Sequence, residues 1–295
     1  MTTPTSEYHR IIRDVLENGV MEPNRTGINA VTIAGAQFTC DTSLGFPAIT
    51  TKQLFFRTVM IELEGFIKGI TDKKWYQDRR CNIWDEWCRP DLVAYGHGDE
   101  RQAAMKAERD LGPVYGFQWR HFGADYQSYD SNYLGQGVDQ LKNAIDTLRK
   151  DPRNRRIIVQ AWNPTQIGMM ALPACHIGYQ LTVTNGKLNL LWNQRSCDLM
   201  LGIPFNIASY AILQHLIARD VGMPTGRLVG QLNDVHIYEN HLEGAREQLS
   251  RDPERHAPPT IVTEGESTSI FDWDHTMTKL IDYKHDPAIK MEVAV

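Results

Sequence analysis

The chain has 295 residues, of which 42% are hydrophobic and 23% charged, and its formal net charge is −5. This composition is ordinary for a soluble globular protein that can bury a large core. The acidic balance gives no basic footprint for nucleic acid, so we expect any phosphate site to be built locally from a few arginines. No apolar run is long enough for a membrane helix, and the first residues lack the apolar segment of a signal peptide.

Hydrophobic periodicity predicts three elements in the first part of the chain. Residues 7–18 have helical spacing and are followed by Gly19, a common helix terminator. Residues 31–40 have strand character, and residues 57–67 again have helical spacing. The polar, charged stretch 89–109 predicts an exposed insertion.

Helices and strands interleave in the second half of the chain. The predicted elements are a helix at 138–148, a strand at 156–161, a hairpin of 176–184 and 187–194 around Asn185-Gly186, a buried apolar helix at 206–221, a strand at 228–238 and a helix at 239–250. This alternation predicts one α/β (α+β) domain over residues 1–295, with a mixed β-sheet and flanking helices.

The five cysteines favour neither a metal site nor a disulfide framework. Their number is odd and no two form a C-x-x-C pair. We expect reduced thiols in a cytoplasmic protein and no bound metal. The cysteines are Cys40, Cys81, Cys88, Cys175 and Cys197.

One of these thiols has a context that suits a nucleophile. Cys175 follows the short bend Pro173-Ala174 and precedes His176 at the start of a predicted strand. A cysteine is a useful nucleophile when nearby positive charge lowers its pKa. Taken alone, a packed cysteine at a strand start is the commoner case.

Two arginine clusters could supply that charge and bind an anion. Arg155 and Arg156 head one predicted strand, and Arg195 with Ser196 lies near the end of another. Guanidinium groups suit phosphate, although a solvated pair beside a turn is the commoner arrangement. Asn206 is either a helix N-cap or an amide that pairs with the edge of a pyrimidine.

Aromatic and histidine side chains suggest further contacts. His236 and Tyr238 share one face of a predicted strand and could hold a sugar hydroxyl, although polar residues on a solvated face are common. Trp84 and Trp87 flank two carboxylates. Core packing is the ordinary role of such residues, and stacking on a flat heterocycle is the functional alternative.

These stretches occur in an order that resembles the thymidylate synthase family. The matching segments are Arg25-Thr26-Gly27, Phe46-Pro47, Thr50-Thr51-Lys52, Glu62, Trp84-Asp85-Glu86-Trp87, Leu111-Gly112-Pro113-Val114-Tyr115-Gly116, Arg155-Arg156, Ala161-Trp162-Asn163, Cys175-His176, Gln194-Arg195-Ser196, Gly202-Ile203-Pro204-Phe205-Asn206, His236-Ile237-Tyr238 and Val293-Ala294-Val295. They span nearly the whole chain. The resemblance implies the fold of that family and a dimer formed through the sheet.

The resemblance also implies a reaction, the methylation of dUMP to dTMP. Cys175 is implied to add to carbon 6 of the pyrimidine, Glu62 to move protons at the base carbonyl, and Tyr115 to lie near the proton lost from carbon 5. Arg195, Asp198 and His176 are implied to assist. The implied nucleotide contacts are Arg25, Arg155, Arg156, Gln194, Arg195, Ser196, Cys197, Asp198, Asn206, His236 and Tyr238.

The implied co-substrate is 5,10-methylenetetrahydrofolate. Its implied contacts are Lys52, Phe55, Ile83, Trp84, Trp87, Asp198, Leu201, Gly202, Phe205, Ala294 and Val295, the last two closing over the site. In the implied homodimer, Arg155 and Arg156 complete the nucleotide site of the other subunit. Neither DNA nor a membrane is an expected partner.

Some positions depart from the usual pattern of the family. They are Phe55, where many members have a histidine, Glu64-Gly65 for Leu-Trp, Ala174 for a proline, Asn193 for a tyrosine and Leu232-Asn233 for Gly-Gly. None removes a group that the first chemical steps need. The alternatives are a dUMP hydroxymethylase, in which water replaces the final hydride transfer, and a non-catalytic nucleotide- or RNA-binding dimer.

Overall fold

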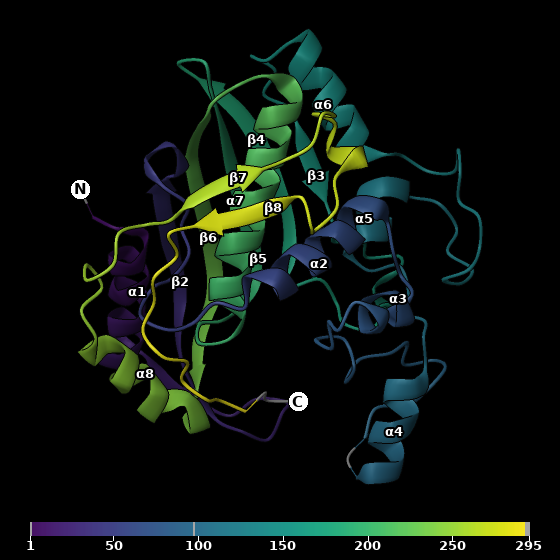
Figure 1. Ribbon diagram of the computed structural model, residues 1–295. Coiled ribbons are helices and arrows are strands. Elements are labelled where there is room, and N and C mark those ends of the chain that lie inside the picture. Colours follow the sequence, from purple (N-terminus) through teal and green to yellow (C-terminus); the bar gives the residue numbers. More distant parts are fainter. Residues whose placement is uncertain (1, 97, 293–295) are drawn as a thin grey trace.

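A six-stranded mixed sheet forms the centre of the molecule (Figure 1). The computed structural model describes residues 2–96 and 98–292. The strands are β1 (Val20–Glu22), β2 (Ala30–Asp41), β3 (Ile158–Gln160), β4 (His176–Thr184), β5 (Lys187–Asp198) and β6 (Thr225–Tyr238), in the spatial order β1-β2-β6-β5-β4-β3. Neighbours are antiparallel except the parallel pair β5–β6. The predicted mixed sheet is confirmed.

Helices pack around this sheet, and a second small sheet lies over the longest of them. The helices are α1 (Pro4–Asn18), α2 (Phe56–Lys68), α3 (Lys73–Asp78), α4 (Asp99–Ala107), α5 (Tyr115–His121), α6 (Gln140–Lys150), α7 (Gly202–Val221) and α8 (Leu242–Ser250), with short 3-10 turns at Thr42–Leu44, Ile167–Met169, Glu239–His241 and Ile270–Asp272. The second sheet pairs β7 (Thr260–Thr263) with β8 (Thr278–Ile281). No helix within the described ranges is long and apolar enough to cross a membrane.

Helix α7 is the core element that the sequence predicted, but it begins earlier than expected. Its apolar residues are buried against β5 and β6. The Asp198 carboxylate accepts hydrogen bonds from the backbone N–H groups of Met200 and Leu201, at 3.0 and 3.2 Å, and so turns the chain into a helix that starts at Gly202. Asn206 therefore lies inside the helix, and its interpretation as an N-cap is wrong.

The predicted hairpin is confirmed, including its turn. Asn185 and Gly186 have φ angles of 52° and 72°, as a tight hairpin turn with two left-handed residues requires. Strand β5 continues to Asp198, four residues beyond its predicted end. Trp192 and Gln194 lie on the same face of β5, because side chains alternate along a strand.

Other boundaries differ from the predictions for local reasons. Strand 156–161 shortens to three residues. The helix predicted from residue 138 begins at Gln140, because the Asp139 side chain caps it by accepting a hydrogen bond from the Lys142 N–H at 3.0 Å. The described residues of the stretch 89–109 are mostly exposed and include α4, which extends away from the sheet (Figure 1).

The departure at Glu64-Gly65 has a structural role on α2. A Cβ atom at Gly65 would lie 2.1 Å from the hydroxyl oxygen of the buried Tyr76, so only glycine leaves room for that ring. The buried Glu64 carboxylate accepts hydrogen bonds from Lys68 Nζ at 2.6 Å and His275 Nδ1 at 2.7 Å. It thereby ties the segment before β8 to α2.

The departures at positions 193 and 233 meet on the exposed face of the sheet. The Asn233 side chain donates a hydrogen bond to the Asn193 side-chain oxygen at 3.0 Å. Both residues are exposed, as are Gln37 and Gln231 on neighbouring strands, while Gln194 is buried. Asn193 points away from Gln194 as predicted.

Candidate active site

A large cavity lies beside Cys175. Its volume is about 1580 Å³. The lining comes from β2, β5 and β6, from residues 22–26, and from the segments 82–96, 99–106 and 162–175. Seven of the sequence-predicted site residues line it, namely Arg25, Trp87, Cys175, Arg195, Ser196, His236 and Tyr238.

Cys175 is held between a tyrosine and an arginine. Its backbone N–H donates a hydrogen bond to the Tyr115 hydroxyl at 2.8 Å, and Arg195 Nη2 lies 3.9 Å from its sulfur. The Arg195 guanidinium also donates to the Pro173 carbonyl at 2.7 Å and to the Ala174 carbonyl at 3.0 Å. One side chain thus holds the bend before the thiol and places positive charge beside it.

The charge beside Cys175 does not outweigh its burial in the isolated chain. Burial raises the pKa of the Cys175 thiol, while the Arg195 charge, hydrogen bonding with Tyr115 and, to a smaller extent, the Arg25 charge lower it, and the net direction is upward. The predicted arginine field is therefore present but does not by itself make a resting thiolate. Burial raises the pKa of Cys197, two residues beyond Arg195, to about 12.

His176 lies behind the nucleophile and takes part in an aromatic support. Its ring stacks on Tyr115, with centroids 4.0 Å apart and planes 12° apart, and its Nδ1 lies 2.8 Å from the Tyr210 hydroxyl. Burial lowers the pKa of His176 to about 3, so the ring is neutral at physiological pH. This geometry favours a role for His176 in positioning Tyr115 over a role in accepting a proton from Cys175.

Glu62 on α2 is the titratable carboxyl best suited to move protons near neutral pH. Burial raises the pKa of Glu62 to about 7, against a smaller lowering effect of the Trp84 indole. The Trp84 N–H is buried and makes no hydrogen bond of normal geometry within the described residues. A carboxyl with a pKa near the working pH can both accept and donate a proton.

His236 and Tyr238 present polar groups to the cavity from β6. Their ring centroids are 5.1 Å apart. His236 Nδ1 lies 3.2 Å from the Asp234 carbonyl oxygen, which can only accept, so Nδ1 carries the hydrogen. In the neutral ring, Nε2 then remains an acceptor for a hydroxyl group.

The other sequence-predicted residues lie outside the cavity lining. The Gln194 side chain donates a hydrogen bond to Asn206, and Lys52 is buried with its ammonium donating to the Met200 carbonyl. Arg155 and Arg156 are exposed. Also outside the lining are Phe55, Glu62, Ile83, Trp84, Tyr115, His176, Cys197, Asp198, Leu201, Gly202 and Phe205, while Ala294 and Val295 lie outside the described residues. Within 2–96 and 98–292, no cluster of His, Cys, Asp and Glu is arranged to hold a metal ion.

Comparison with known proteins agrees with this arrangement. A family model described as thymidylate synthase matches residues 6–295. The chain belongs to the thymidylate synthase family.

Its similar relatives include proteins with one and with two activities. A bifunctional dihydrofolate reductase-thymidylate synthase of Leishmania major is 42% identical over 294 residues, which cover 98% of this chain and 55% of that protein. The corresponding protein of Paramecium tetraurelia is 41% identical over 98% of this chain and 61% of its own length. A thymidylate synthase of varicella-zoster virus (strain Dumas) is 40% identical over 98% of this chain and 94% of its own length. The chain thus spans little more than half of the two bifunctional relatives.

Some cavity residues were not assigned to the site from the family resemblance. Trp162 lines the cavity, and the Arg195 guanidinium lies 5.4 Å from its ring centroid. Tyr95, from the predicted insertion, also lines it and donates a hydrogen bond to the Cys88 carbonyl at 2.9 Å. The motif Ala161-Trp162-Asn163 pointed to the first residue, whereas no local pattern in the insertion pointed to the second.

Proposed function

We propose that the chain catalyses the methylation of dUMP to dTMP with 5,10-methylenetetrahydrofolate as co-substrate. The observation that carries the proposal is the placement of Cys175 beside Arg195 at a cavity that His236 and Tyr238 also line. Nucleophile, phosphate-binding charge and sugar-binding groups thus share one space. Membership in the thymidylate synthase family supports the assignment of this chemistry.

The nucleotide is activated by addition of the Cys175 sulfur to carbon 6 of the pyrimidine. The electron pair of the carbon 5–carbon 6 double bond moves toward the carbonyl at carbon 4, and carbon 5 becomes a nucleophile. Glu62 supplies and removes protons on the carbonyl side. Carbon 5 forms a bond to the one-carbon unit of the co-substrate and then loses its proton near Tyr115. The sulfur leaves carbon 6 as the double bond between carbons 5 and 6 reforms.

The site has room and suitable groups for a second ligand. A cavity of about 1580 Å³ exceeds the range of about 300–1000 Å³ that is usual for one small molecule. Trp87 lines the cavity and offers an aromatic surface. When bound, methylenetetrahydrofolate supplies the one-carbon unit and the hydride that completes a methyl group.

Identification of the nucleotide product tests the proposal. The chain incubated with dUMP and methylenetetrahydrofolate is expected to form dTMP and dihydrofolate, measured by the mass of the nucleotide and the absorbance of dihydrofolate. A product carrying a 5-hydroxymethyl group, formed together with tetrahydrofolate, would instead establish the hydroxymethylase alternative. Omission of folate is the control and leaves the nucleotide unchanged.

We also propose that the active unit is a homodimer formed through the exposed sheet face. Exposed side chains lie on three adjacent strands, Gln37 on β2, Gln231 on β6 and Asn193 on β5, which pair in register. Arg155 and Arg156 are exposed and do not reach the cavity of their own chain. In a dimer, these two arginines would instead contact the phosphate of the nucleotide bound in the cavity of the other subunit.

Complementation between two defective subunits tests the shared site. Cys175→Ala and Arg155→Ala proteins are each expected to be impaired as homodimers. After unfolding and refolding of an equal mixture, half of the dimers are mixed and each has one intact site, so about one quarter of wild-type activity returns. Mixing Cys175→Ala with the Cys175→Ala/Arg155→Ala double variant is the control and restores none. If the first mixture also stays inactive, the arginine acts within its own subunit.

A further inference from the structure

A chain of side-chain hydrogen bonds runs from the core to Asn206. The indole Nε1 of Trp192 donates to Gln194 Oε1 at 3.1 Å. Gln194 Nε2 donates to Asn206 Oδ1 at 3.0 Å and to the Ser196 carbonyl at 3.1 Å. Trp192 and Gln194 are almost completely buried, at 0% and 2% exposure, so water does not compete for these bonds.

The chemistry of the two ends fixes the orientation of both amides. An indole N–H can only donate and a carbonyl can only accept. The Gln194 oxygen must therefore face Trp192, and its NH₂ group must face Ser196 and Asn206. Asn206 in turn presents Oδ1 to Gln194, and its Nδ2 has no protein partner within the described residues.

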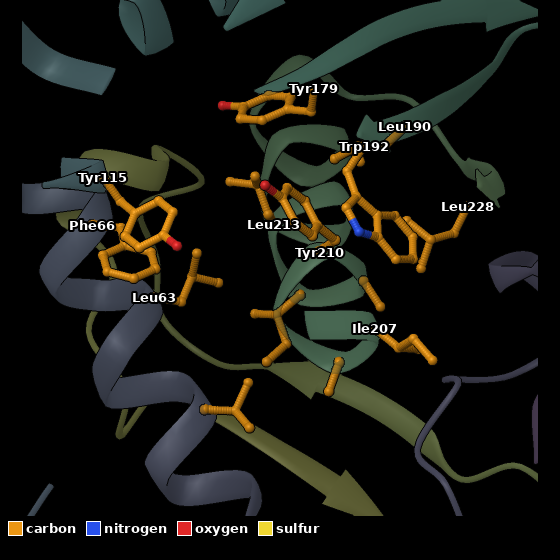
Figure 2. Close-up of a cluster of buried hydrophobic side chains, with 14 of the residues drawn as sticks. Leu63, Phe66, Tyr115, Tyr179, Leu190, Trp192, Ile207, Tyr210, Leu213 and Leu228 are labelled. Atoms are coloured by element: carbon orange, nitrogen blue, oxygen red, sulfur yellow. The ribbon is translucent and has the colours of Figure 1, made fainter. Parts of the chain in front are cut away.

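The Trp192 indole is itself held in one position. It stacks on Tyr210 of α7, with centroids 5.2 Å apart and planes 12° apart, and Figure 2 shows the two rings side by side in the buried cluster. A Cβ atom at Gly230 would lie 2.3 Å from the indole ring, so glycine at that position of β6 makes room for it. The indole N–H of Trp192 therefore cannot turn away. It is the first donor in the chain of hydrogen bonds from Trp192 through Gln194 to Asn206, which we call the relay.

We propose that Trp192 is a positioning residue for nucleotide specificity, which selects uracil over cytosine by fixing the Asn206 amide through Gln194. The inference rests on the proposed function and on the role that the family resemblance implies for Asn206, the pairing of its amide with the edge of the pyrimidine base. Uracil presents an acceptor, the carbonyl oxygen at carbon 4, and a donor, the N–H at position 3. Cytosine presents the reverse, an NH₂ donor at carbon 4 and an acceptor nitrogen without hydrogen at position 3. An asparagine that rotates by 180° suits cytosine equally well, and the relay prevents that rotation.

The Trp192→Phe variant tests this role, because phenylalanine keeps an aromatic ring against Tyr210 and lacks the N–H. The affinities for dUMP and dCMP are measured by calorimetry, which needs no turnover. The ratio of the two affinities is expected to fall about fivefold to tenfold, the effect of one buried neutral hydrogen bond. An unchanged ratio in a folded variant overturns the proposal.

Trp119→Phe is the matched control, since Trp119 is also buried, at 1% exposure, and takes no part in the relay. Its thermal unfolding is compared with that of Trp192→Phe, and its affinity ratio is expected to stay at the wild-type value. A fall of equal size in both variants would overturn the proposal, since it would reflect a general loss of packing.

A second variant keeps the inference testable if Trp192→Phe does not fold. In Gln194→Glu, a side chain without donors draws the Asn206 NH₂ group toward itself and turns Oδ1 to the base. The preference is expected to shift toward dCMP, and an unshifted preference contradicts the relay.

The same measurements separate the relay from the base-reading role. Asn206→Asp is expected to favour dCMP. If it leaves the preference unchanged, the implied base-reading role of Asn206 is wrong. If Asn206→Asp shifts the preference and both relay variants do not, only the relay is wrong.

Discussion

Cys175→Ala is expected to lower the rate of dTMP formation by about four orders of magnitude or more, the scale seen when a covalent nucleophile is removed. The addition to carbon 6 has no substitute in the site. Cys197, the cysteine next to the cavity residue Ser196, is fully buried, and the pKa of its thiol is raised to about 12. Dihydrofolate absorbance gives the rate, and dUMP affinity is expected to change far less, because Arg195 and His236 remain.

Cys40→Ala is the matched control, since Cys40 is a half-buried thiol on β2 outside the cavity lining. Its rate is expected to equal that of the wild type. A second readout is the mass of the protein incubated with 5-fluoro-dUMP and methylenetetrahydrofolate. Fluorine cannot leave carbon 5 as a proton does, so the mass is expected to increase by the nucleotide and the folate together, and only when Cys175 is present. If Cys175→Ala retains every measurable function of the wild type, the non-catalytic nucleotide-binding alternative replaces the proposed enzyme.

The sequence predicted those parts of the fold that local chemistry decides. Asn185-Gly186 specifies its turn, and the long apolar run of α7 specifies a buried helix. The hairpin β7–β8 was not predicted, because strands of four residues carry too little periodicity. Tertiary contacts position this hairpin instead, including a hydrogen bond of 3.1 Å between the side chains of Thr263 and His215 of α7.

The sequence named candidate site residues, seven of which line one cavity, but it did not predict the contacts between them. Cys175 and Tyr115 are 60 positions apart, and their hydrogen bond depends on how α5 packs against β4. The shared face of Trp192 and Gln194 follows from strand alternation. The hydrogen bond from Gln194 to Asn206 could not be predicted in this way, because it depends on where α7 begins. The sequence analysis placed that start four residues too late.

The Glu62→Gln variant is expected to lower kcat by about 10²- to 10⁴-fold, the usual contribution of general acid–base catalysis. Glutamine keeps the size of the side chain but cannot exchange a proton. Since burial raises the pKa of Glu62 to about 7, the wild-type pH–rate profile is expected to bend near that pH. The variant is expected to lose this bend, and a profile that keeps it would assign the titration to another group.

The same variant is expected to become more stable than the wild type at neutral and alkaline pH. The pKa of Glu62 is about 7 in the folded chain, against an ordinary value of 4.5. The folded protein binds the Glu62 proton more tightly than the unfolded chain does. The contribution of this proton to the stability of the fold is therefore complete below pH 4.5 and is lost as the pH rises to 7. Above that pH, Glu62→Gln avoids the burial of a charge and gains at most about 3 kcal/mol.

Glu64→Gln, two positions along the same helix, provides a control of opposite sign. Burial alone would raise the pKa of Glu64, but hydrogen bonds from Lys68 and His275 outweigh it and hold the pKa below its ordinary value. This carboxylate stabilises the fold above its unfolded pKa, and the effect disappears as the pH falls through its folded pKa. Glu64→Gln is therefore expected to destabilise the protein at neutral pH, where Glu62→Gln stabilises it. Urea unfolding at pH 4.5 and pH 8 gives the free energy of unfolding of both variants. Changes of the same sign relative to the wild type at pH 8 would contradict the assignment of Glu62 as the functional carboxyl with a raised pKa.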